Sequence, residues 1–374
     1  MSTCRSVVKL FPGLLALAVL TTAGWSAARG VTKVKMTDSS LSLRSLQPHS
    51  ADTAWVRSYN GPGNSADRAN AMQVDAAGSV YVTGQSHSLQ GIDCVTLKYD
   101  TDGNLLWERH YRGPLDDTMN VPVKLVLDGA GNVYVAGWSL LPTYDYFTLK
   151  YDNGGTLKWH RRYNGPADGS DVLAGLAVDR AGNAYVTGYS AGVGTGTDFA
   201  TLKYDSAGTL IWERRYDGPL SKDDAASAIE VDSSFNVFVG GGAATDSIDS
   251  GEFGYISTRD FATLKYDLNG TLLWTRLYSG AGHTNDAASA MQVDVMGNVC
   301  ITGISDGGLG HFFDYATLKY DPNGNLLWER RYDGPSHLYD EPFALQTDAA
   351  SECLAHPGVD LGGRDMSVAQ VPLD

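Results

Sequence analysis

The sequence is dominated by an internal repeat of about fifty residues, and this repeat constrains the fold more than any other feature. Six tryptophans recur at spacings of 52, 52, 53, 62 and 54 residues, and each begins the phrase W-x-R-x-Y. Self-similarity at a fixed period is typical of architectures in which each repeat is one supersecondary unit. The six phrases are Trp55-Arg57-Tyr59, Trp107-Arg109-Tyr111, Trp159-Arg161-Tyr163, Trp212-Arg214-Tyr216, Trp274-Arg276-Tyr278 and Trp328-Arg330-Tyr332.

Each repeat contains four short runs that are rich in β-forming residues. In the unit from Asp75 to Trp107 these runs belong to AMQVD, VYVTG, DCVTLKYD and LLWERHY. Two of the connections have the form D-x-x-G, in which Asp can accept backbone hydrogen bonds and Gly takes the left-handed position that closes a hairpin. Phe235 replaces this glycine once. The repeat therefore predicts a four-stranded antiparallel sheet.

Repeated four-stranded sheets can build a β-helix, an array of sandwiches or a β-propeller. A period near fifty residues with one tryptophan per unit favours an all-β propeller of four-stranded antiparallel blades. The run LLWERHY carries large residues on both faces of the strand. We expect this of a blade that its neighbours cover on both sides.

The ends of the chain bear on the number of blades. Five full repeats run from residue 63 to residue 332, and a degenerate sixth follows at 343–374. We predict six blades, in which residues 52–62 complete the last blade and close the ring beside Val368–Leu373. The alternatives are seven blades, or a chain truncated or frame-shifted after Ala350 whose tail forms no blade.

The N-terminus has the pattern of a secretory signal peptide at residues 1–28. Arg5 and Lys9 precede an apolar run, Leu10–Ala23, and Ser26-Ala27-Ala28 supplies the small residues of a cleavage site. A Ser/Thr-rich linker at 29–51 separates this segment from a propeller domain at 52–374. We expect a secreted, periplasmic or cell-surface protein with no membrane span after signal removal; a retained anchor is the alternative.

Charge and cysteine content narrow the possible partners. The formal net charge is −15, which disfavours nucleic acid and anionic membranes and favours cations or basic partners. Cys4 leaves with the signal, so three cysteines remain in separate repeats. We expect Cys94 and Cys300 to be small buried side chains and find no support for a disulfide framework.

The phrases VDxxGNVYVTG and DxATLKYDxxGxLLWERRY resemble the bacterial SBBP repeat, which is named for a seven-bladed β-propeller. The resemblance covers nearly all of Asp52 to Asp348. The cadence D-x-x-G-x-x-x-W is also similar to quinoprotein-like propellers, and DxxGNVYV resembles NHL repeats. The SBBP resemblance implies an exported repeat protein of mostly undefined role, implies seven blades where the repeat count gives six, and carries over no catalytic residue.

One face of the predicted propeller is the better candidate for binding, because function concentrates where loops vary on a rigid frame. We call the four strands of a blade a to d in chain order. The a–b and c–d turns are uniform, whereas the b–c loops vary in length; the longest is Gly241–Asp260. We therefore place a ligand site on the face of the b–c and d–a connections, although a long loop can also be a tolerated insertion. The candidate residues are Trp138, Tyr144, Asp246, Asp249, Glu252, Phe253, Tyr255, His311 and Phe312.

An aspartate also recurs after the Y-x-G-P phrases (Y-S-G-A before Asp286), where the first strand of a blade begins. Several carboxylates around a channel mouth could bind Ca²⁺. The structural interpretation is stronger: each aspartate satisfies backbone amides or pairs with the arginine of a W-x-R-x-Y phrase. The candidates are Asp67, Asp171, Asp224, Asp286 and Asp340, with Asn120 at this place in the second unit.

Motifs for catalysis are missing, since the sequence has no metal-protease, C-x-x-C, nucleophile-elbow or phosphate-loop pattern. We predict no catalytic residue and no cofactor beyond possible Ca²⁺. The leading hypothesis is a monomeric interaction module that binds protein or glycan. The alternatives are a propeller enzyme (a quinoprotein-like oxidoreductase, or a carbohydrate lyase or hydrolase) and a non-functional spacer or truncated remnant.

Overall fold

The computed structural model describes residues 7–8, 55–88, 90–113, 119–140, 142–249, 255–282, 285–307, 313–334, 340–347, 353–357 and 369–370. All regular elements in these ranges are β-strands. None of the described segments forms a helix long and apolar enough to cross a membrane.

The repeat strands form five groups of four consecutive antiparallel strands, as the repeat predicts. The first two groups belong to one eight-stranded sheet, because Ile92 pairs in parallel with Met119, and each of the other three groups is a sheet of its own. In chain order they are β3 (Asp67–Val74), β4 (Val80–Ser88), β5 (Gly91–Tyr99) and β6 (Leu105–Tyr111); β7 (Met119–Leu127), β8 (Val133–Leu140), β9 (Tyr144–Tyr151) and β10 (Leu157–Tyr163); β11 (Asp171–Val178), β12 (Ala184–Ala191), β13 (Thr197–Tyr204) and β14 (Leu210–Tyr216); β15 (Ala225–Val231), β16 (Val237–Asp249), β17 (Tyr255–Tyr266) and β18 (Leu272–Tyr278); and β19 (Ala287–Val293), β20 (Val299–Asp306), β21 (Phe313–Tyr320) and β22 (Leu326–Tyr332). We number these groups of four strands blades 1 to 5.

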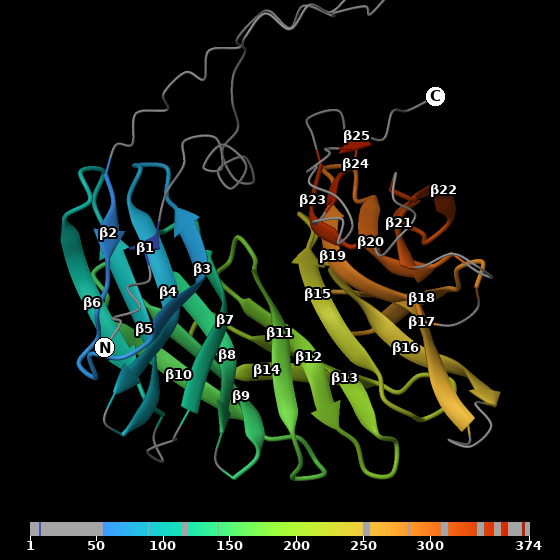
Figure 1. Ribbon diagram of the computed structural model, residues 1–374, viewed down its shortest axis with the longest axis horizontal. Coiled ribbons are helices and arrows are strands. Elements are labelled where there is room, and N and C mark those ends of the chain that lie inside the picture. The colour runs from blue at the N-terminus through green and yellow to red at the C-terminus, as the bar shows by residue number, and fades with distance from the viewer. Residues whose placement is uncertain are drawn as a thin grey trace, which may run out of the picture.

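A sixth sheet has three strands, β23 (Pro342–Thr347), β24 (Cys353–Pro357) and β25 (Ala369–Gln370), and we call it blade 6. Figure 1 shows the six blades side by side along an arc, with blades 1 and 6 at its two ends. The first strands of successive blades contact one another in chain order, from β3 to β23. This arrangement confirms the predicted all-β propeller architecture of four-stranded blades.

The hydrophobic core lies between the blades. Tyr81 and Trp107 of blade 1 pack against Val133, Val135 and Leu149 of blade 2, and all five side chains are buried. Equivalent clusters fill the following junctions. Each sheet therefore depends on its neighbour for the burial of its apolar face, which is the main stabilising term in folding.

The outer strand is less covered than its sequence suggests. Trp107 is buried, but the preceding Leu105 and Leu106 are 48% and 53% exposed. The expectation that neighbouring blades cover all the large residues of LLWERHY is therefore wrong. These leucines begin the fourth strand, which has no further strand beyond it in the sheet.

The W-x-R-x-Y phrase fastens each blade to the next one. Trp159 Nε1 donates to the carbonyl oxygen of Ser206 at 3.1 Å, and Arg161 Nε donates to that of Gly208 at 2.5 Å. Both acceptors lie in the c–d turn of the following blade, and Lys150 Nζ reaches the Ser206 oxygen as well, at 3.0 Å. The phrase recurs because each junction needs the same tryptophan and arginine contacts.

The turn glycine is required both by its own backbone and by the neighbouring tryptophan. Gly208 has φ of 84°, and a Cβ atom there would lie 2.7 Å from the Trp159 ring. An L-residue is disfavoured in this left-handed region. Phe235, at φ of 67°, takes the equivalent position in an a–b turn, where its ring contacts the Arg180 guanidinium at 4.7 Å.

The segment before blade 1 behaves as the fourth strand of a preceding blade. Trp55 Nε1 donates to Thr101 at 3.0 Å and Arg57 Nε to Gly103 at 2.6 Å, as the other phrases do with their next blades. The short strand β2 (Arg57–Ser58) pairs with β1 (Val7–Val8), whereas β25 pairs with β24. Closure of the ring and the number of blades stay predictions, because residues 358–368 and 371–374 lie outside the described residues.

The cysteines correct one expectation. Cys300 of β20 forms a disulfide with Cys353 of β24, with their Cα atoms 6.2 Å apart. This bond links blade 5 to blade 6, so the expectation that Cys300 is only a small buried side chain is wrong. Cys94 has the predicted role, since its free thiol is buried, and burial raises its pKa to about 12. Three cysteines remain after removal of the predicted signal, and an odd number does not indicate which of them pair. Cys300 and Cys353 also lie in different repeats, so no single repeat shows their proximity.

Candidate functional site

A groove opens between blades 1 and 2 on the face that we predict to bind ligand. On the blade 1 side its wall comes from the start of β3, the end of β4 and the start of β5. On the blade 2 side its wall comes from the start of β7 and the end of β8. All of these positions adjoin b–c or d–a connections. The hollow has a volume of about 400 Å³ and is lined by Arg68, Ala69, Asn70, Gln85, Ile92, Met119, Val121, Pro122, Val123 and Trp138.

The groove combines polar side chains with one aromatic ring. Arg68 and Gln85 are opposite each other on β3 and β4, and Asn70 Nδ2 donates to the carbonyl oxygen of Pro122 at 2.7 Å. Trp138 lies on the other side, on β8. Ligand sites typically pair an apolar or aromatic surface with a few oriented hydrogen-bonding groups.

Trp138 packs against Tyr144, another of the residues that we predict to bind ligand. The rings of Trp138 and Tyr144 pack edge to face, with centroids 5.1 Å apart and planes at 85°. Trp138 lies two residues before the end of β8 and Tyr144 begins β9, so the antiparallel pairing of the two strands brings the rings together. The structure thus joins two of the predicted ligand-binding residues, and Trp138 lines the groove.

The predicted loop Gly241–Asp260 is mostly strand. Its residues pair across β16 and β17 as far as Asp249 with Tyr255, so the insertion lengthens a hairpin, which Figure 1 shows extending beyond its neighbours. Asp246 is exposed on this arm. The side chains of Asp249 and Tyr255 lie outside the described residues, as do Glu252, Phe253, His311 and Phe312. A ligand site around these residues therefore stays a prediction.

The recurring aspartates at the start of the first strands are buried and bind backbone amides. Asp171 Oδ2 accepts from Gly165 N at 2.6 Å and Oδ1 from Ala191 N at 3.2 Å. Burial raises the pKa of Asp171, while a hydrogen bond from Ser190 and those amides oppose the shift. The same glycine-amide contact is made at the four other aspartates, Asp67, Asp224, Asp286 and Asp340. Binding of backbone amides is thus confirmed.

The predicted arginine partners of these aspartates are wrong. The arginines of the W-x-R-x-Y phrases donate to turn carbonyls at the opposite end of the blades. In blades 2, 3 and 5 the arginine that pairs with a carboxylate comes one residue later: Arg162 binds Asp145, Arg215 binds Asp198 at 2.7 Å and Arg331 binds Asp314 at 3.2 Å. Side chains alternate between the two faces of a strand, so adjacent arginines cannot share a partner.

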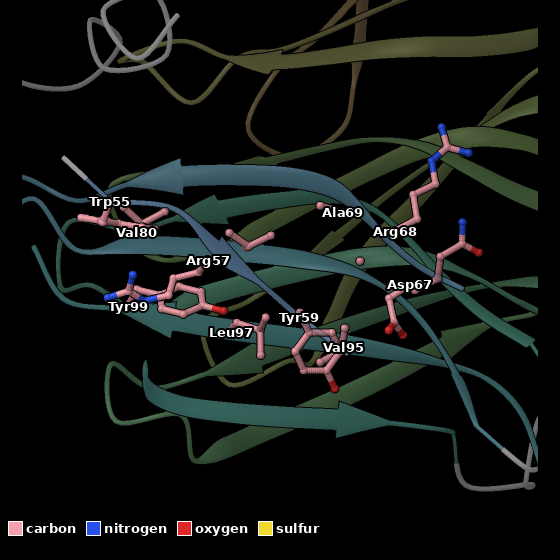
Figure 2. Close-up of a pocket in the computed structure, with 13 residues that line it drawn as sticks. Trp55, Arg57, Tyr59, Asp67, Arg68, Ala69, Val80, Val95, Leu97 and Tyr99 are labelled. Atoms are coloured by element: carbon pink, nitrogen blue, oxygen red, sulfur yellow. The ribbon is translucent and has the colours of Figure 1, made fainter. Parts of the chain in front are cut away.

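A second hollow, of about 50 Å³, lies on the apolar face of blade 1. Figure 2 shows Trp55, Val80 and Tyr99 toward one end of it and Asp67 and Arg68 toward the other. The equivalent face of blade 2 is covered by blade 1. On blade 1 the fourth-strand segment supplies Trp55, whose ring lies 5.8 Å from that of Tyr99. We interpret this face as a surface for blade packing and not as a ligand site.

These features define the class of protein: a β-propeller repeat protein whose blades are clasped by a turn-binding tryptophan and arginine. Residues 158–194, which include one W-x-R-x-Y phrase, match the family model of the SBBP β-propeller repeat. This match confirms the resemblance that the repeated phrases predict, and it identifies that segment as an SBBP repeat.

Comparison with whole proteins adds no function. A solved structure of a protein of unknown function from Bacteroides caccae is similar over 76% of this chain and 87% of that chain, with 11% sequence identity and a TM-score of 0.42. No curated protein matches the sequence.

The sequence singles out Trp138 but not Arg68, Asn70 and Gln85, which line the same groove. These three lie in strands, at positions that the repeat does not distinguish from structural ones. Their proximity to Trp138 arises from the junction of two blades, which a search within one repeat unit cannot show.

Proposed function

We propose that this chain is an exported interaction module that binds a partner through the groove between blades 1 and 2. The groove favours a glycan over a protein. A sugar presents an apolar ring face that stacks on an aromatic side chain and hydroxyls that pair with amide and guanidinium groups. Trp138, Asn70, Gln85 and Arg68 offer these two kinds of contact.

Export is part of this proposal. The signal-like N-terminus motivates it, and the disulfide between Cys300 and Cys353 supports it. Disulfides persist in oxidising compartments such as the periplasm or the extracellular space.

The groove gives less support to a hydrolase. Glycoside hydrolysis uses two carboxylates about 5–10 Å apart on either side of the bond that is cleaved. Among the described residues that line the groove, none is an Asp or Glu. Binding without cleavage is therefore the function that this geometry supports best.

A glycan array probed with the purified protein tests the proposal. For a bound glycan, Trp138→Ala and Arg68→Ala should each weaken the affinity about 10-fold or more, because stacking and charged hydrogen bonds contribute roughly 1–3 kcal/mol each. Leu106→Ala is the control, since this exposed leucine lies on the outer strand. Unchanged binding in both groove variants, or capture of a protein ligand only, would contradict glycan binding in the groove.

A further inference from the structure

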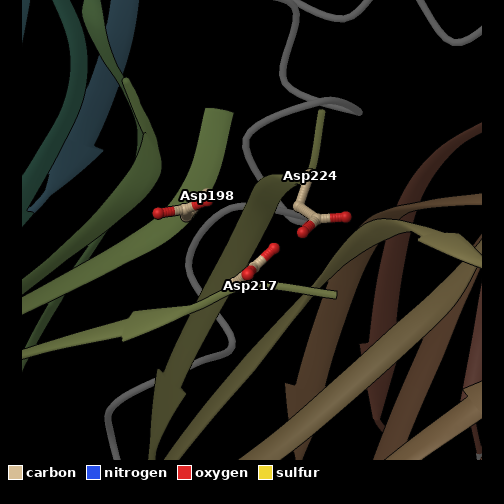
Figure 3. A group of neighbouring side chains, drawn as sticks. All are labelled: Asp198, Asp217 and Asp224. Carbon is tan, nitrogen blue, oxygen red and sulfur yellow. The ribbon is translucent and has the colours of Figure 1, made fainter. Parts of the chain in front are cut away.

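Three aspartates meet at the junction of blades 3 and 4, away from the groove. Asp198 lies in β13, Asp217 follows β14 and Asp224 precedes β15. One carboxylate oxygen from each lies within 4.8 Å of the other two. Figure 3 shows the carboxylates of Asp217 and Asp224 pointing toward each other, with Asp198 on a neighbouring strand. We call this group the first acidic triad.

Asp198 has a buried oxygen with no partner. Its side chain is 6% exposed, and Oδ2 accepts a hydrogen bond from Nη2 of Arg215 at 2.7 Å. Oδ1 is buried and accepts no hydrogen bond from the residues that the structure describes. Buried polar atoms are nearly always satisfied in native proteins. This atom therefore points to a ligand in contact with Asp198.

Asp224 carries a second, more deeply buried charge. It is 0% exposed, and each of its oxygens accepts one backbone amide, Gly218 N at 2.5 Å and Ala244 N at 2.6 Å. Asp217 and Asp198 each place a carboxylate oxygen within 4.8 Å of one of its oxygens. Each oxygen keeps one lone pair, since a carboxylate offers about four acceptor sites.

The two neighbouring junctions lack this accumulation of negative charge. At the junction of blades 2 and 3 the place of Asp217 is taken by Asn164, and at that of blades 4 and 5 by Ser279. The first acidic triad therefore contains one carboxylate, that of Asp217, at a position where these two junctions have a neutral side chain.

The groups that compensate Asp171 in blade 3 are also absent around Asp224 in blade 4. Arg215 and a hydrogen bond from Ser190 lower the pKa of Asp171. The arginine position, opposite Ala200 in blade 3, holds Leu277 in blade 4, opposite Ala262. The position of Ser190 holds Ala243. Together with Asp217, which stands where the junction of blades 2 and 3 has Asn164, these two replacements act in the same direction. Each leaves the buried Asp224 carboxylate with more negative charge around it, less positive charge or fewer hydrogen-bond donors.

The same arrangement recurs at the junction of blades 5 and 6. Asp314, Asp333 and Asp340 take the equivalent places and bring three carboxylate oxygens within 4.8 Å of one another. We call this group the second acidic triad. As in the first triad, the outer two positions are buried and the middle one is exposed.

We propose that the two acidic triads are Ca²⁺ sites. Calcium takes six to eight oxygen ligands at about 2.3–2.6 Å in flexible geometry, so carboxylate oxygens up to roughly 5 Å apart can share one ion. The exposed Asp217 and Asp333 leave room for water to complete the shell. These sites are independent of the glycan groove. They would fasten blade 3 to blade 4 and blade 5 to blade 6 on the loop face.

Calorimetric titration of the chelator-treated protein with CaCl₂ at pH 7.5 tests the proposal. We expect two sites. Asp217→Asn, which installs the residue of the neighbouring junction, should abolish one site or weaken it at least 10-fold. Asp333→Asn should do the same to the other site, and the double variant should titrate with neither. Both aspartates are exposed, so the fold should persist, and circular dichroism checks this.

A matched control is Asp168→Asn, which removes an exposed carboxylate from the connection between blades 2 and 3. Its φ of 52° is one that asparagine adopts readily, and it should leave both sites intact. Absence of Ca²⁺ binding by the unmodified protein at millimolar concentration would overturn the proposal. Unchanged titration of the double variant would do so as well.

Discussion

Leu277→Arg should convert the environment of Asp224 into that of Asp171. Leu277 is 42% exposed, so an arginine can replace it at little packing cost. The new guanidinium would take the place of Arg215 in blade 3. We therefore expect the variant to be more stable than the unmodified chain when calcium is removed, and to lose the first calcium site because a fixed cation now neutralises it.

The magnitude follows from the pKa of Asp224. Its folded value is raised to about 6, against about 3.9 in an unfolded chain, and one pKa unit corresponds to about 1.4 kcal/mol. A carboxyl group with a raised folded pKa stabilises the native state at low pH. That stability is lost as the pH rises from about 4 through about 6, so the calcium-free protein should lose about 3 kcal/mol over this window.

Leu277→Arg should restore part of this loss, about 1–2 kcal/mol, since Asp171 keeps a raised pKa even beside Arg215. Besides burial, the charged groups that raise the pKa of Asp224 are Asp217 and Asp198. Tyr216 also lies beside Asp224, whose charge, after burial, raises the pKa of the Tyr216 hydroxyl. Thermal unfolding in chelator at a series of pH values from 4 to 8 measures the effect. The curves should converge at pH 4 and separate by pH 7. Parallel curves for the two proteins would refute the reasoning.

Two further predictions concern the scaffold. Gly208→Ala should lower the free energy of unfolding by about 2–4 kcal/mol, because it adds a clash with Trp159 to the cost of a left-handed alanine; Gly194→Ala, with the same φ of 84° but open space around its Cβ position, should incur only the backbone cost in thermal melts. Cys353→Ser should remove about 4 kcal/mol from blade 6, since the bond to Cys300 spans 53 residues. Limited proteolysis should then cut the tail faster, whereas equal rates would contradict this.

The fold was largely predictable because its determinants repeat. Each unit needs a tryptophan such as Trp159 to reach the next turn and a glycine such as Gly208 to admit its ring. Five or six copies of one requirement make a clear pattern. The partner of Cys300 was not predictable in the same way, because its disulfide joins two units at a single place.

The site was less predictable, for physical reasons. The aspartate after Y-x-G-P is repeated, and its amide contacts explain the repetition. The proposed calcium sites depend on departures from the repeat, such as Asp217 and Leu277. The effect of such a departure can be judged only when its three-dimensional neighbours are known. Trp138 was found because an aromatic residue at a strand end is conspicuous in the sequence. Arg68 was missed because its neighbour across the groove belongs to another blade.

The face of the D-x-x-G turns holds the blades together, and we propose that the opposite face, with the b–c and d–a connections, binds ligands. A crystal structure of the protein grown with terbium tests this most directly. Terbium replaces calcium and scatters anomalously. We predict two anomalous peaks on the loop face, one among Asp198, Asp217 and Asp224 and one among Asp314, Asp333 and Asp340. Peaks confined to the D-x-x-G turns of the opposite face, or none at the triads, would contradict it.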